Sequence, residues 1–240
     1  MDVSGKKAVV FGGTSGIGLA TTKRLAAGGA QVVAVSRDPS KAGDVPAGVT
    51  LEACDVLDRD AVAALCAKHA PIDILISAAT GGKRAMGPFC EMDMDGYKGS
   101  FDKLWGYANV VRYGAQHVAD GGSITLVSGA PARRCKPGQV SLSSVGGAVE
   151  AMVRAVAPEI APKRINVVSP GTIDTPINPM DQGPERKAFY DKATANNLIP
   201  RAGTADEVAQ GIMFVVENDF VTGITVDVDA PPASVADAYL

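Results

Sequence analysis

Short runs rich in β-branched residues alternate with alanine-rich segments along the whole chain. The runs have the length of buried strands, and the segments between them have the apolar spacing of amphipathic helices. The expected strands cover residues 7–11, 31–36, 49–56, 73–77, 123–128, 164–169 and 224–228, and the expected helices 17–29, 58–69, 96–119, 140–161 and 204–217. Because such helices carry the chain back over a sheet, the alternation predicts an α/β fold, doubly wound, with a seven-stranded parallel sheet and helices on both faces.

The composition indicates one globular domain over residues 1–240. The chain is 46% hydrophobic and 20% charged, and it contains no repeat, low-complexity tract or linker. It has no apolar run of membrane-spanning length and begins directly with a strand, so we expect a cytoplasmic protein with no membrane partner. The four cysteines lack metal-ligand spacing, and the net charge is −3. We therefore expect no metal, no nucleic acid and a small-molecule substrate.

The strongest motif is GGTSGIG at residues 12–18, between the first strand and the first helix. Gly12 allows a tight turn, Gly16 lets the backbone approach a pyrophosphate, and Gly18 lets the helix pack close to the sheet. The helix N-terminus adds unpaired N–H groups and a positive dipole end. Together with Thr14, Ser15 and Ile17, these glycines predict a dinucleotide site.

The chain resembles the short-chain dehydrogenase/reductase family over nearly its whole length. The family's glycine motif reads Thr-Gly-x-x-x-Gly-x-Gly, and here Phe11 replaces the threonine. Two further segments carry the likeness, CDV at 54–56 and PGTIDT at 170–175, and the family's Asn-Asn-Ala-Gly segment corresponds to SAAT at 77–80. The resemblance implies that the cofactor contacts Asp55, Val56, Ser77, Ala78, Ala79, Pro170, Gly171, Ile173 and Thr175.

The end of the second strand predicts which dinucleotide binds. The residue that faces the adenosine ribose is expected at Ser36 or Arg37, and neither is acidic. An acidic residue there would accept hydrogen bonds from the ribose 2′-hydroxyl of NAD, whereas an arginine pairs with a 2′-phosphate. The sequence therefore predicts NADP(H), held by Arg37 with Ser36 as a second donor.

The catalytic residues of the family are absent from the corresponding positions. Related reductases have a serine at the end of the fifth strand and, thirteen residues later, the tyrosine of a Tyr-x-x-x-Lys pair. By this spacing the three positions are Gly129, Leu142 and Gly146, and the family's asparagine on the preceding helix corresponds to Lys103. Because a positioned acid is worth about 10²–10⁴-fold in rate, we expect poor reduction of simple ketones. An iminium carbon needs only an adjacent hydride donor, since its nitrogen is already protonated.

An anionic group is then needed to hold a cationic substrate. Asp174 is the best placed, and Asp102 is a weaker alternative because it can pair with Lys103. Lys103 is expected either to contact the nicotinamide ribose or to lie in solvent, and Arg133, with Arg134, to form a rim of the active site or a surface pair. The segment from Ile177 to Asn197 is expected to form a lid or a variable surface loop.

Three hypotheses about function remain open at this point. The first is an NADPH-dependent reductase of an imine or iminium, a chemistry that resemblance to reductases of fungal alkaloid pathways places in secondary metabolism. The second is a cyclase or isomerase that uses the cofactor structurally, and the third is a non-catalytic NADPH-binding protein. The resemblance also implies a homodimer or homotetramer, packed through residues 96–119 and 140–161 with Gly146, Gly147 and Ala148 at the contact.

Overall fold

One parallel sheet of seven strands forms the centre of the molecule in this computed structural model, which describes residues 1–80 and 84–232. The strand order is β3-β2-β1-β4-β5-β6-β9, which confirms the predicted doubly wound α/β fold. The strands are β1 (Lys7–Phe11), β2 (Gln31–Ser36), β3 (Thr50–Ala53), β4 (Ile72–Ser77), β5 (Val118–Val127), β6 (Arg164–Pro170) and β9 (Thr225–Val228).

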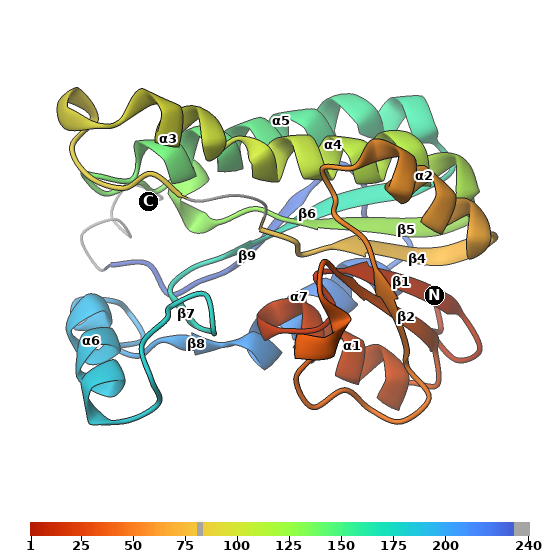
Figure 1. Cartoon of the computed structure of the whole chain (residues 1–240), viewed down its shortest axis with the longest axis horizontal. Coiled ribbons are helices and arrows are strands. Elements are labelled where there is room, and N and C mark those ends of the chain that lie inside the picture. Colours follow the sequence, from red (N-terminus) through yellow and green to blue (C-terminus); the bar gives the residue numbers. More distant parts are fainter. Residues whose placement is uncertain (81–83, 233–240) are drawn as a thin grey trace.

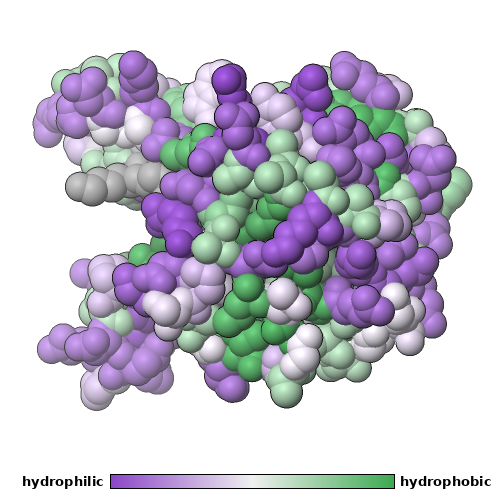
Figure 2. Space-filling view, turned by 45° about the vertical axis from the view of Figure 1, so that its right-hand side comes forward, coloured by the Kyte–Doolittle hydropathy of each residue, from purple (hydrophilic) through white to green (hydrophobic). Residues whose placement is uncertain are grey.

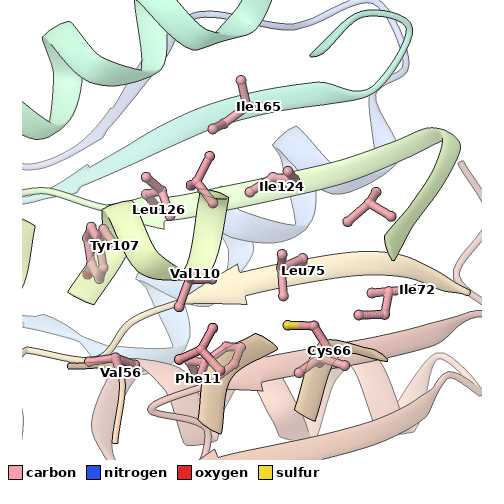
Figure 3. Packing of buried hydrophobic residues seen from close by; sticks show 14 of the residues in the cluster. Phe11, Val56, Cys66, Ile72, Leu75, Tyr107, Val110, Ile124, Leu126 and Ile165 are labelled. Carbon is pink, nitrogen blue, oxygen red and sulfur yellow. The ribbon is translucent and has the colours of Figure 1, made fainter. Parts of the chain in front are cut away.

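Helices cover both faces of this sheet (Figure 1). One face carries α2 (Arg59–Lys68), α4 (Asp102–Gly114) and α5 (Val140–Ile160), and the other carries α1 (Gly16–Ala27) and α7 (Ala205–Glu217). Each face encloses its own apolar core. In the first core, Tyr107 and Val110 of α4 lie over Leu126 of β5 and Leu75 of β4 (Figure 3). The inner strands β1, β2, β4 and β6 are buried on both faces, which explains why they are continuous β-branched runs.

The order of the strands sets where a ligand can bind. The chain moves from β1 outward to β2 and β3, then returns to β4 on the other side of β1 and continues to β5, β6 and β9. The connections after β1 and after β4 therefore diverge, which leaves a crevice at the carboxyl ends of these strands.

The prediction of one continuous helix over residues 96–119 is wrong. The chain forms α3 (Met94–Gly99), then α4, then a 3₁₀ turn at Ala115–His117. The break lies at Ser100, whose hydroxyl donates to the Gly96 carbonyl and accepts the Ala85 N–H at 2.9 Å each. A serine that bonds the carbonyl four residues back bends a helix, and here the same hydroxyl also holds a neighbouring loop.

The fifth strand is longer than predicted, because it begins at Val118. The sequence Asp-Gly-Gly at 120–122 is typical of a turn, but Gly121 takes a φ of +76°, and the register with β4 shifts between Ile72 and Ile74. Glycine tolerates this conformation, so the strand continues through an irregularity.

The segment predicted as a lid contains a helix, α6 (Pro184–Thr194). It is flanked by a two-stranded parallel sheet, β7 (Ile173–Asp174) with β8 (Gly203–Thr204). These elements lie beyond the carboxyl ends of the large sheet (Figure 1). Short 3₁₀ turns complete the described chain at Pro39–Lys41, Phe89–Glu91 and, as η4, Ala130–Ala132.

Helix α5 is long and apolar enough to cross a bilayer by length and composition alone, the one such helix in the part of the chain that the structure describes. In the fold it lies against β6, α4 and η4. Its buried side includes Val145, Val149 and Val153, as expected for a helix in the core of an α/β domain.

Candidate functional site

A cavity of about 650 Å³ opens at the carboxyl ends of the central strands. Its walls come from the segments that follow β1, β2, β4, β5 and β6, from α4 and α5, and from residues 229–232. Figure 2 shows a notch at one side of the molecule, with mostly hydrophilic residues along its rim. The cavity lies at the crevice that the strand order predicts.

The glycine motif forms one end of this cavity and has the close contacts that only glycines permit. A Cβ on Gly12, whose φ is +78°, would lie 2.8 Å from the Ala79 nitrogen, and one on Gly18 would lie 2.0 Å from the Gly12 oxygen. A Cβ on Gly16, whose φ is +50°, would lie 3.6 Å from the Thr175 Cβ, and the Ser15 side chain does not cap α1. The N-terminal N–H groups of α1 therefore point toward an open cradle that fits a pyrophosphate.

The expected 2′-phosphate site lies at the end of β2. Ser36 and Arg37 both line the cavity. The buried Oγ of Ser36 has no hydrogen-bond partner among the described residues, and Arg37 is exposed and forms no ion pair with them. The adjacent Asp38 is already paired with Lys41 at 2.9 Å. An unsatisfied hydroxyl beside an uncommitted guanidinium fits a phosphate ligand.

The remaining expected cofactor residues line the same cavity, apart from Ser77. Those that do so are Thr14, Ile17, Asp55, Val56, Ala78, Ala79, Pro170, Gly171, Ile173 and Thr175. The Ser77 side chain is fully buried within the sheet and is not part of the cavity lining, so a cofactor contact of this residue stays a prediction. Because side chains alternate between the two faces of a strand, its last residue need not point toward the open end.

The four positions that the spacing in the sequence assigns to the family's catalytic residues line one common part of the cavity. Gly129, Leu142, Gly146 and Lys103 all line it. A Cβ on Gly146 would lie 3.0 Å from the Ala132 Cβ, so η4 occupies the direction in which a side chain at residue 146 would point. Tyr107 also lines the cavity, but its hydroxyl donates to the Val127 carbonyl at 2.9 Å, and burial raises its pKa.

Lys103 reaches from α4 to the end of β5. Its Nζ donates to the Ser128 carbonyl at 2.9 Å and lies 5.6 Å from the centre of the Tyr107 ring. Burial, assisted by the nearby Arg84 guanidinium, lowers the pKa of Lys103 to about 7. Of the three residues expected to act directly on the substrate, Lys103 is the one that lines the cavity.

Asp174 is not among the residues that line the cavity, although its neighbours Ile173 and Thr175 are. Its Oδ1 accepts hydrogen bonds from Nε and Nη2 of Arg186 on α6, at 2.8 and 2.5 Å. The buried Arg186 also donates to the carbonyls of Thr175, Asn178 and Met180. A carboxylate held by this arginine anchors α6 and the loop before it, and it is not free to pair with a cationic ligand.

Arg133 also lies outside the cavity lining, in an ion-pair network beneath it. Its guanidinium bridges Glu150 of α5, at 3.3 Å, and Asp227 of β9. The buried Glu150 in turn accepts the Ser128 hydroxyl at 3.0 Å. Arg133 therefore fixes the loop after β5, whereas the neighbouring Arg134, paired with Asp229 at 2.8 Å, lines the cavity.

Several residues of the site were not predicted. Glu150 follows residues 142 and 146 at intervals of four, which puts all three on one helix face, so this signal was present in the sequence. Arg84 and residues 229–232 reach the cavity through loop paths. The latter are held there by a bridge between Asn197 and Pro232 and by the Leu198 N–H on the Pro231 carbonyl. No local pattern marks these contacts.

Comparison with known proteins supports the geometry. The family model described as enoyl-(acyl carrier protein) reductase matches residues 12–230. A cyclic-di-GMP-binding biofilm dispersal mediator protein of Escherichia coli is 30% identical over 239 residues, with 94% of this chain and 96% of the relative covered. A short-chain dehydrogenase/reductase, malC, of Malbranchea aurantiaca is 24% identical over 256 residues, with 94% of each chain covered.

A solved structure gives the same result. A small-chain dehydrogenase in complex with NADPH superposes with a TM-score of 0.78 and 28% identity, over 93% of this chain and 96% of that chain. The glycine cradle, the strand order and the family match agree with one another. The chain belongs to the short-chain dehydrogenase/reductase family.

Proposed function

We propose that the protein binds NADPH and reduces the C=N bond of an imine or iminium substrate, in a pathway of secondary metabolism. One observation carries the proposal. The cofactor half of the cavity keeps its glycine cradle, while the positions that usually supply a proton and hold a carbonyl oxygen are Leu142, Gly146 and Gly129. Such a site retains a hydride donor and lacks the tyrosine acid that ketone reduction needs.

The choice of NADPH over NADH is supported by the end of β2. Arg37 has no carboxylate partner among the described residues, and Ser36 has an unsatisfied hydroxyl. Both would hold the 2′-phosphate, with the pyrophosphate at the N-terminus of α1. Pro170, Gly171 and Thr172 line the cavity at the end of β6 and would hold the nicotinamide. A relative of known structure binds NADPH.

The chemistry that NADPH supplies when bound is hydride donation to the carbon of the C=N bond, whose π electrons move to a nitrogen that already carries its proton. The residues of this chain then have to hold the cation and exclude water. Asp102 lines the cavity and makes no ion pair with any described residue, so it replaces Asp174 as the group proposed to face the iminium nitrogen. Leu142, Val145 and Ile177 add apolar wall.

The test is NADPH oxidation by the purified protein, followed at 340 nm, with cyclic imines and with ketones of the same carbon skeleton. We expect turnover of the imines, at least 10²-fold faster than of the ketones, because the ketones lack an acid to protonate the alkoxide. Turnover of the ketones with no reaction of the imines would refute the proposal.

Two other outcomes would indicate a different function. Product formed at the same rate with NADP⁺ would indicate a cyclase or isomerase, because no hydride is consumed. Cofactor affinity without any turnover, together with a partner protein recovered in pull-down, would indicate a binding protein. The relative malC bears the name of a short-chain dehydrogenase/reductase, and a structure of MalC is described as a reductase/Diels-Alderase, so this relative fits either reduction or cyclisation and the NADP⁺ control decides between them.

A further inference from the structure

We propose that Arg84 and Lys103 form a binding site for a carboxylate group of the substrate, next to the place of hydride transfer. The substrate would then be an imine that carries its own carboxylate. This inference rests on the proposed function and specifies the class of compound that the cavity accepts. The inference rests on these two cationic side chains, which line the same half of the cavity.

The backbone that carries Arg84 is fixed on the wall of the cavity. The Ala85 N–H donates to the Ser100 hydroxyl at 2.9 Å, and the Ser141 hydroxyl donates to the Ala85 carbonyl. Two residues further on, the Gly87 N–H donates to the Gly138 carbonyl at 3.0 Å. These hydrogen bonds join residues 85–87 to the corner between α3 and α4 on one side and to the beginning of α5 and the loop before it on the other. They hold the backbone next to Arg84 in place.

Lys103 is held on the neighbouring wall. Its single contact with a described oxygen is the Ser128 carbonyl, which leaves two of its three N–H donors for a ligand. Arg84 is close enough for its charge to act on Lys103. Two like charges at this separation repel each other, and an anion placed between them relieves the repulsion.

The other charged groups of this half do not neutralise the pair. Arg134 is already paired with Asp227 and Asp229, and Lys136 lies exposed at the rim. Neither Arg84 nor Lys103 forms an ion pair with a carboxylate in the described ranges, 1–80 and 84–232. Asp102 is the remaining carboxylate of this half, and it faces the substrate nitrogen in the proposed function.

The charge balance favours a carboxylate over other anions. Arg84, Lys103 and Asp102, taken without the exposed Lys136 that also lines the cavity, carry one net positive charge, which one carboxylate balances. The planar guanidinium of Arg84 also matches the two oxygens of a carboxylate. A bare iminium cation would be repelled by this half of the cavity, whereas a substrate with an iminium and a carboxylate is neutral overall. The carboxylate of such a substrate would pair with Arg84 and Lys103, and its iminium nitrogen with Asp102.

The experiment measures binding without turnover. The full-length protein, saturated with NADP⁺, is titrated by calorimetry with cyclohexanecarboxylate and, separately, with the uncharged cyclohexanecarboxamide. We expect the acid to bind at least tenfold more tightly than the amide. Arg84→Gln and Lys103→Met should each weaken the acid at least tenfold and leave the amide unchanged, with NADP⁺ kept at saturation for each variant. Lys98→Gln, on the exposed side of α3 and outside the cavity, is the matched control and should change neither ligand.

Equal affinity for acid and amide, or an acid affinity that survives both substitutions, would overturn the carboxylate site. Tighter binding of cyclohexylphosphonate than of the acid would overturn the choice of carboxylate. Arg84 is exposed, so its substitution does not put the fold at risk. The titration involves no hydride transfer, so it tests the carboxylate site independently of the proposed reduction. If cyclohexanecarboxylate binds as expected but 1-pyrroline-2-carboxylate is not reduced by NADPH, the carboxylate site holds and the proposed function fails. If both the carboxylate site and the proposed reduction hold, we expect the KM for 1-pyrroline-2-carboxylate to be at least tenfold lower than the KM for 2-methyl-1-pyrroline, which has no carboxylate.

Discussion

Lys103 combines a position in the cavity with a pKa of about 7. Its surroundings are Arg84 from the loop, Asp102 and Tyr107 from its own helix, and the end of β5, where Ser128 is bonded to Glu150. Below pH 7 the ammonium is charged and attracts an anion. Above pH 7 it loses its proton, so an anionic ligand loses one partner.

This titration gives a measurable pH dependence. We expect the Kd of the cyclohexanecarboxylate complex to rise with pH above about 7, approaching tenfold per pH unit, because binding then takes up a proton. The amide should bind equally from pH 6 to 9, and Lys103→Met should remove the slope for the acid. Calorimetry in buffers of different ionisation enthalpy measures the number of protons that the complex takes up when cyclohexanecarboxylate binds. A pH-independent Kd of the acid would show that Lys103 is not its partner.

Arg37 gives the second prediction at the scale of a residue. Arg37→Ala should weaken NADPH binding about ten- to hundred-fold, because a charge-assisted contact contributes about 1.5–3 kcal/mol. NADH affinity should stay the same, since NADH has no 2′-phosphate. Lys41→Ala, in the same loop but paired with Asp38, is the control. An unchanged Kd for NADPH would contradict the assignment of the 2′-phosphate site.

Secondary-structure elements differ in how far the sequence predicts them. The seven strands of the large sheet were predicted, with ends that differ from the observed ones by up to five residues, because buried parallel strands are continuous apolar runs. The break between α3 and α4 was missed because it depends on Ser100, whose hydroxyl bonds a residue of another segment. Helix α6 was missed because its stability comes from Arg186 and the loop it binds, and not from an apolar face.

Arg186 therefore connects α6 to Asp174 and to the loop before the helix. Arg186→Met should increase hydrogen exchange in residues 174–197, because five of its hydrogen bonds to Asp174 and to the loop are lost. Exchange in the large sheet should remain slow, since no strand of that sheet contacts this side chain through a hydrogen bond in the described chain. Lys187→Ala, which removes an exposed pair with Asp191 on the same helix, is the control. Unchanged exchange in α6 would contradict the anchoring role.

At the scale of the whole molecule, the cofactor site was more predictable than the substrate site. Residues 12–18 and 170–175 are local motifs whose geometry follows from glycine and helix termini. Arg84, Arg134 and Asp229 come together only after the loops after β4, β5 and β9 have folded over one opening. The sequence likewise did not show that Asp174 pairs with Arg186 and Arg133 with Asp227, because ion pairs between separate elements leave no local pattern.

Cofactor binding should stabilise the folded molecule as a unit. At NADPH concentrations of 100 Kd the gain is about 2.7 kcal/mol, which corresponds to a rise in Tm of about 5–10 °C for a domain of this size. The same concentration of NADH should raise the Tm by less, because it binds more weakly. Differential scanning fluorimetry measures both, and equal shifts for the two cofactors would contradict NADP(H) preference.

For assembly, we propose a homodimer or homotetramer through the outer sides of α4 and α5. Trp105 of α4 is 64% exposed, and a Cβ on Gly147 of α5 would meet nothing within 4 Å. Gly146 does not belong to this surface, contrary to the expectation, because it faces η4. Light scattering should show an oligomer for the native chain and a monomer for Trp105→Lys. An oligomer that survives this change would exclude this surface.

The contact between Gly146 and Ala132 also bears on protein engineering. A lysine at residue 146 requires η4 to move, and η4 is fixed at one end by the ion pairs of Arg133 with Glu150 and Asp227. Point substitutions that introduce the tyrosine and the lysine would therefore act on a loop that has to adjust at the same time. The unit of redesign is the whole stretch 129–150, loop and helix together, so conversion of this enzyme to a ketone reductase calls for transplantation of a segment.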